Sequence, residues 1–167
     1  MSSSHCDGGL HRPNSWRTCN IAIPGLFDDP FGILWPVLAH LALIQFLFVM
    51  VSIRRQQASR RNELKVDDLA HAGREPERSR RWARNLDNQF QLPMLFYVLV
   101  AILIVQDKAG ALQIALAWVF VIGRYLHTAV QTQTDNVALR GQVFIINYAA
   151  LSLMWLAFFA RSFGMIQ

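Results

Sequence analysis

Cationic and amide side chains recur at helical spacing in the second half of the chain. Arg84, Asn88 and Gln91 stand at i, i+4 and i+7, so one helix would present all three on one face. Arg124 and His127 follow at i and i+3. Guanidinium groups bind carboxylates in a bidentate fork, and amides and imidazoles add hydrogen bonds beside them. These residue types therefore predict a site for a ligand that carries carboxylate or thiolate groups.

The elements that must position these residues are apolar. Of 167 residues, 53% are hydrophobic and 16% are charged, whereas a soluble domain carries about 25% charged residues. The net charge of +5 does not indicate a nucleic-acid-binding protein, because the basic residues cluster beside apolar segments and do not alternate with aromatic ones. Composition and length together predict one integral membrane domain.

Four apolar stretches predict four membrane-spanning helices. Each reaches the roughly 30 Å of a bilayer core at about 1.5 Å per residue. The second reaches this length only if the amphipathic turns from Arg84 onward belong to it, because its strictly apolar part covers 92–105. Pro36 and Pro93 lie inside helices and are expected to kink them. The expected fold is an all-α four-helix membrane bundle over 31–163, with helices at about 31–53, 80–106, 109–130 and 138–163.

The distribution of arginine and lysine predicts the topology. Ten of the 16 Lys and Arg residues lie between Arg54 and Arg84, so the positive-inside rule places the basic loop 54–79 in the cytoplasm. Four spans then put both termini outside, and residues 1–30 form an extracytoplasmic extension without the apolar core of a signal peptide. Cys6 and Cys19 in this extension are either a disulfide or two unpaired thiols, and their spacing is not that of a metal site.

With the helices placed in this way, polar groups from three of them meet near the cytoplasmic interface, where Arg140 opens the fourth helix. For the arginines of this cluster, contact with a ligand competes with packing between helices against Asp87 or Asn88. His127 is more readily explained as a packing residue than as a base. The remaining polar residues have structural interpretations: lipid-phosphate contacts for Arg78, Arg80 and Arg81, a structural role for His40, and a hydrogen bond across helices for Asn147.

The ordered motifs resemble those of the MAPEG family, the membrane-associated proteins in eicosanoid and glutathione metabolism. The second helix of that family carries Arg-x-x-x-Asn-x-x-Glu shortly before a proline, and its third helix carries Gly-Arg-x-x-His. Its fourth helix opens with an arginine. The resemblance covers roughly residues 31–160, and the matching positions here are Arg84, Asn88, Gln91 and Pro93, then Gly123, Arg124 and His127, then Arg140.

This resemblance implies a homotrimer that binds glutathione between subunits at the cytoplasmic side, while a lipophilic co-substrate approaches from the bilayer. Arg84, Asn88 and Arg124 would bind glutathione, with Gln91 and His127 in the same site, and Arg140 would stabilise the thiolate. No metal is implied. The LPMLFY run is similar to that of bacterial members, which implies a bacterial inner membrane.

Four positions depart from the family pattern and leave two functions open. Gln91 replaces a glutamate, Gln131 and Phe144 replace tyrosines, and Gly141 replaces a serine found in some members. Each change removes a hydrogen bond worth about 0.5–1.5 kcal/mol from the expected site. One function is a glutathione-dependent transferase, peroxidase or isomerase acting on a hydrophobic electrophile. The alternative is a noncatalytic membrane subunit or scaffold that binds lipid or a larger membrane complex.

Overall fold

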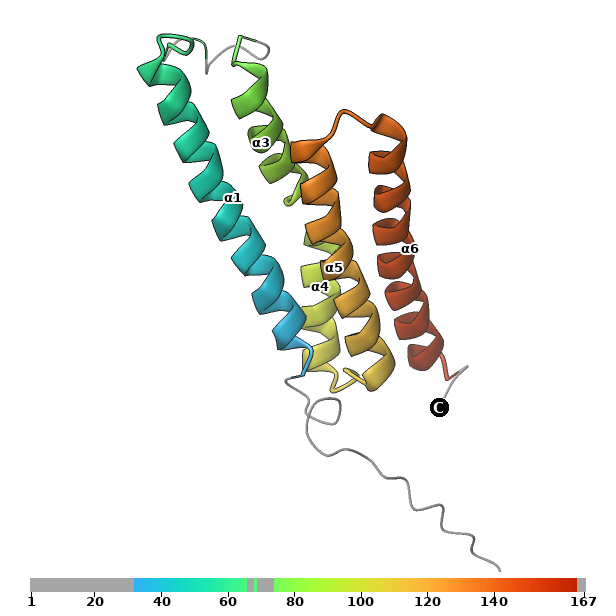
Figure 1. The fold of residues 1–167 in the computed structure, drawn as a ribbon. Helices are drawn as coiled ribbons and strands as arrows, with labels where there is room; N and C mark the ends of the chain where they lie inside the picture. The colour runs from blue at the N-terminus through green and yellow to red at the C-terminus, as the bar shows by residue number, and fades with distance from the viewer. Residues whose placement is uncertain (1–31, 66–67, 69–73, 165–167) are drawn as a thin grey trace, which may run out of the picture.

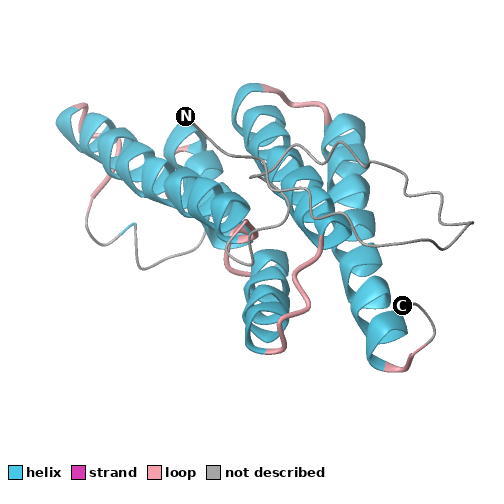
Figure 2. Cartoon of the chain, turned by 90° about the horizontal axis from the view of Figure 1, so that it is seen from below, coloured by secondary structure: helices cyan, strands magenta, loops and turns pink. Residues whose placement is uncertain are grey.

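Helices joined by short connections make up the part of the chain that the structure, a computed structural model, describes. These residues are 32–65, 68 and 74–164, so the expected extension 1–30 with Cys6 and Cys19 lies outside them. No strand occurs in the described ranges, and the expected all-α fold is confirmed (Figures 1 and 2). The long helices are α1 (Leu34–Arg60), α3 (Glu77–Asn88), α4 (Leu92–Val105), α5 (Ala111–Gln133) and α6 (Val137–Ser162).

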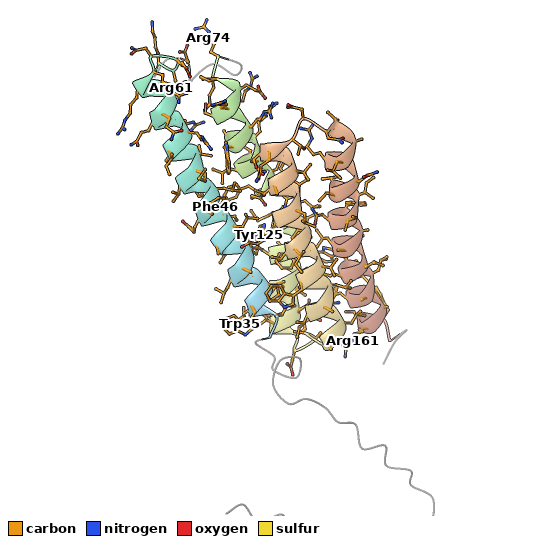
Figure 3. All side chains as sticks on the ribbon, viewed as in Figure 1. Trp35, Phe46, Arg61, Arg74, Tyr125 and Arg161 are labelled. Atoms are coloured by element: carbon orange, nitrogen blue, oxygen red, sulfur yellow. The ribbon has the colours of Figure 1, made fainter. Side chains whose placement is uncertain are left out.

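Four segments of the described chain are long and apolar enough to cross a membrane, as predicted. They are α1, the α3–α4 pair, α5 and α6. The end of α1, the start of α3 and the α5–α6 connection lie at one end of the bundle (Figure 1). We call this the arginine-rich end, because Arg61 and Arg74 lie there, whereas Arg161 lies at the opposite end (Figure 3).

The second span is broken, where the sequence predicts one helix over about 80–106. α3 ends at Asn88, and α4 begins at Leu92 after a turn at 89–91. The cause is Pro93, which lacks an N–H and whose ring would clash with the carbonyl of residue 89 in a continuous helix. Pro93 instead occupies the first turn of α4, where its missing N–H removes no helical hydrogen bond. Gln91 therefore lies in the turn and not on the helix that carries Arg84 and Asn88.

Two buried apolar clusters hold the helices together. The larger joins α4, α5 and α6, and in it the rings of Phe96 and Phe120 stack with their centroids 4.8 Å apart. The smaller joins α1 to α3 through side chains that include Leu47 and Leu86. Large apolar side chains also cover the outer faces, as Trp35 and Phe46 do on α1, which suits helices surrounded by lipid.

Candidate functional site

A cavity of about 530 Å³ lies between α3, α5 and α6 near the arginine-rich end. We call it the polar pocket. It brings together five of the six side chains that the sequence singles out, from three helices and the turn after α3. Whether these residues bind a ligand stays a prediction. The lining residues are Arg84, Asp87, Asn88, Gln91, His127, Gln131, Val137, Arg140, Gly141 and Phe144.

Arg124 is the predicted site residue that does not line the pocket. Its side chain is 1% exposed and packs between α5 and the end of α3. Its Nε donates a hydrogen bond to Oε1 of Gln89, and its Nη2 donates one to the backbone carbonyl of Asn88, both at 3.0 Å. The break after Asn88 leaves that carbonyl without its helical partner. The structure therefore favours the helix-packing interpretation of Arg124.

Arg124 belongs to a buried polar network that connects three spans. The Oε1 atom of Gln89 also lies 3.1 Å from Nε2 of His40, and Nδ1 of His40 lies 2.5 Å from the hydroxyl of Tyr97. The amide of Gln89 donates to Oδ1 of Asn85 at 2.8 Å. His40 is thus structural, as expected. The sequence analysis missed Asn85 and Gln89, although their i, i+4 spacing on α3 was a visible signal.

The two arginines of the polar pocket have different surroundings. Nη2 of Arg84 donates to Oε1 of Glu77 at 2.9 Å, and Glu77 is the first residue of α3, about two helical turns before Arg84. Arg140 lies in the first turns of α6, and within the described part of the chain it forms no ion pair. The α6 N-terminus adds its own partial positive charge beside Arg140. Arg140 is therefore the better placed of the two to bind an anionic group.

The amides of the pocket are partly paired with each other. Nδ2 of Asn88 donates to Oε1 of Gln131 at 3.1 Å, which links α3 to α5 across the pocket wall. His127 is 4% exposed, and its Nδ1 has no hydrogen-bond partner among the described residues. The lining side chains include no hydroxyl. The pocket thus offers guanidinium, amide and imidazole groups and the carboxylate of Asp87, but no Ser, Thr or Tyr oxygen.

The prediction that Asn147 forms a hydrogen bond across helices is wrong within the described chain. Asn147 is fully buried, yet neither Oδ1 nor Nδ2 has a hydrogen-bond partner there. Its side chain instead packs against Gly123 of α5, where an added Cβ would overlap Oδ1 of Asn147. The absence of a side chain at Gly123 therefore lets α5 and α6 approach closely at this level, as small residues do in membrane helix packing.

A second cavity, of about 320 Å³, lies between α4 and α6 on the same side of the protein. We call it the apolar groove. Phe144 of the polar pocket and Tyr148 of the groove are one turn apart on α6, and Gln91 of the pocket directly precedes Leu92 of the groove. A polar site thus adjoins an apolar one. The groove is lined by Leu92, Leu95, Tyr148, Leu151, Ser152, Trp155, Leu156 and Phe159.

The helices and pocket define a class of protein: an integral membrane bundle with a cationic, amide-rich site at one end of its spans. The model of the MAPEG family matches residues 32–160, so the chain belongs to this family, as its motifs predict. No curated protein and no solved structure matches the chain. Among the described residues, no group of three or more His, Cys, Asp or Glu side chains is arranged to hold a metal ion.

Proposed function

We propose that this protein binds glutathione in the polar pocket and presents its thiolate to a lipophilic electrophile held in the apolar groove. The observation that carries the proposal is the convergence of Arg84, Asn88 and Arg140, from α3 and α6, on one cavity. Its volume falls in the range of roughly 300–1,000 Å³ that is typical of small-molecule sites.

The chemistry follows from the charges. A guanidinium beside a thiol favours the thiolate, which is the nucleophilic form. We assign this role to Arg140, because it forms no ion pair in the described chain and lies beside the α6 N-terminus. The thiol proton would pass to water, the thiolate sulfur would form a bond to an electrophilic carbon of the lipophilic substrate, and the group displaced from that carbon would leave with its bonding electron pair. Arg84, Asn88, Gln91 and His127 would hold the rest of the tripeptide.

The proposal includes orientation and assembly. The arginine-rich end faces the cytoplasm of a bacterial cell, and both termini lie on the outer side of the inner membrane, in keeping with the positive-inside rule. A homotrimer is the assembly that family membership suggests, with the polar pocket near a subunit border. The exposed apolar faces of α1 and α6 leave room for both lipid and neighbouring subunits.

A binding titration tests the proposal. The protein is purified in detergent and titrated with glutathione beside two variants, Arg140→Ala and Arg161→Ala. Arg161 is the matched control, since it lies on the same helix at the opposite end of the bundle (Figure 3). We expect binding to weaken at least tenfold in Arg140→Ala and to stay unchanged in Arg161→Ala, because a hydrogen bond to a charged group contributes about 1.5–3 kcal/mol. Absence of binding at millimolar glutathione would contradict the proposal.

The pocket wall also favours a second candidate function, a noncatalytic membrane subunit that binds lipid or a larger membrane complex. The observation in its favour is the neutral character of Gln91, Gln131 and Phe144, together with the absence of any hydroxyl on the wall. A lipid retained in the apolar groove through purification, combined with no glutathione binding, would support this candidate over the enzyme.

A further inference from the structure

The polar pocket contains a carboxylate that the sequence motifs do not single out as a ligand contact. Asp87 lies in the last turn of α3 and lines the same cavity as Arg84 and Arg140. Its side chain is exposed and forms no salt bridge within the described chain, although Arg55 of α1 attracts it at longer range. Asp87 thus adds the one carboxylate of the pocket lining to a site whose other charged groups are cationic, and its oxygens have no salt-bridge partner in the described chain.

The neighbouring charges explain why Asp87 forms no salt bridge with the arginines of the pocket. Arg84, three residues earlier, is in reach of Asp87 by helical spacing, but its guanidinium pairs with Glu77 at 2.9 Å. Glu77 also pairs with Arg80 and Arg81. Asp135, in the connection between α5 and α6, pairs with Arg81. Glu77 and Asp135 are therefore held in salt bridges with arginines, whereas Asp87, which lines the pocket, is not.

The backbone position of Asp87 is also better fixed than that of Gln91. Asp87 lies on α3, whereas Gln91 lies in the turn that Pro93 imposes, with φ −94° and ψ −95°. A carboxylate repels a ligand that is purely anionic and favours one that brings a cationic group to the same place. Two guanidiniums and one carboxylate are complementary to a ligand with two anionic groups and one ammonium.

We infer that the polar pocket selects ligands with a free ammonium beside their carboxylates, and that Asp87 binds this ammonium. The inference rests on the proposed function, since glutathione carries two carboxylates and one ammonium at neutral pH. It assigns to Asp87 the charge that Gln91 lacks. A tripeptide whose amino group is acylated keeps both carboxylates and the thiol but loses the group that Asp87 would bind.

The experiment compares glutathione with N-acetylglutathione on the purified full-length protein. Both ligands are titrated into the unsubstituted protein, into Asp87→Asn, and into Asp107→Asn as the matched control. Asp107 is an exposed aspartate in the α4–α5 turn at the opposite end, and its left-handed φ of 51° is one that asparagine also adopts readily. A fourth sample, Asp87→Asn with Gln91→Glu, moves the carboxylate four residues along the chain, into the turn before α4.

We expect the unsubstituted protein and Asp107→Asn to bind glutathione at least tenfold more tightly than the acylated tripeptide. Asp87→Asn should bind the two ligands almost equally, and the double variant should recover part of the preference. An unchanged preference in Asp87→Asn would overturn the inference and leave the proposed function standing. Failure of the unsubstituted protein to bind either tripeptide would overturn both.

Discussion

Arg124 donates a hydrogen bond of 3.0 Å to the backbone carbonyl of Asn88, the residue at which α3 ends. This contact links the break in the second span to the polar pocket. Pro93 prevents a continuous helix, and the interruption leaves the carbonyl of Asn88 without a helical partner. The buried guanidinium of Arg124 donates a hydrogen bond to that carbonyl instead. The side chain of the same Asn88 faces the pocket. Arg124 is therefore a positioning residue, which holds the pocket wall without lining it.

Replacing Arg124 should destabilise the bundle and weaken binding together. Arg124→Met removes two hydrogen bonds from a charged donor and leaves Oε1 of Gln89 with one partner fewer in a buried network. We expect the free energy of unfolding to fall by about 2 kcal/mol or more, measured by thermal unfolding in detergent. Glutathione affinity should fall as well. Equal stability of Arg124→Met and the control Arg161→Met would contradict this account of the network.

Two glycines should respond in opposite ways to alanine. Gly123→Ala brings a Cβ into Oδ1 of the fully buried Asn147, so it should cost about 1–3 kcal/mol of stability. Gly141→Ala meets no atom within 4 Å. Since alanine is the better helix former by about 0.5–1 kcal/mol, this change on α6 should stabilise the protein. Melting temperatures that shift in the same direction for both variants would show that α5 and α6 do not pack as described.

The number of spans followed from the sequence because hydropathy and helix length depend on local composition. The break in the second span could not be predicted in this way. A proline in a membrane helix either kinks the helix or ends it, and the outcome depends on which group donates a hydrogen bond to the carbonyl that loses its helical partner. Here the donor is Arg124, which lies 36 residues further along the chain than the carbonyl of Asn88.

The composition of the polar pocket was also only partly predictable. Arg124 and His127 lie on neighbouring faces of α5, about 60° apart around the helix axis. The rotation of α5 within the bundle decides which of these two side chains points into the pocket. The packing of Asn147 on Gly123 helps to fix that rotation. Asp87 was a candidate only for packing between helices, because its openness to the pocket depends on Glu77 engaging Arg84.

Restoring a hydroxyl to the polar pocket should strengthen ligand binding. Phe144→Tyr adds a hydrogen-bonding group to a wall that has none, so glutathione affinity should rise about two- to tenfold. Phe159→Tyr, in the apolar groove on the same helix, is the matched control and should leave affinity unchanged. The comparison is made by titration. A gain in Phe159→Tyr equal to that in Phe144→Tyr would argue against a specific site.

The orientation predicts which engineered cysteines react from each side of the membrane. The labelling uses a background with Cys6→Ser and Cys19→Ser. Glu63→Cys, at the arginine-rich end, should react with an impermeant thiol reagent only after the membrane has been permeabilised. Asp107→Cys, in the turn at the other end, should react with an impermeant reagent in intact cells. The reverse pattern would place the polar pocket on the outer side and contradict the positive-inside assignment.

The most direct test of the central claim is the ionisation state of bound glutathione. The ultraviolet difference spectrum of glutathione with the purified protein at neutral pH reports the thiolate. We predict a thiolate signal that saturates with glutathione, disappears in Arg140→Ala and persists in Arg161→Ala, because a guanidinium beside the sulfur favours the charged form. Glutathione that binds without a thiolate signal, or a signal that survives Arg140→Ala, would contradict the role assigned to Arg140.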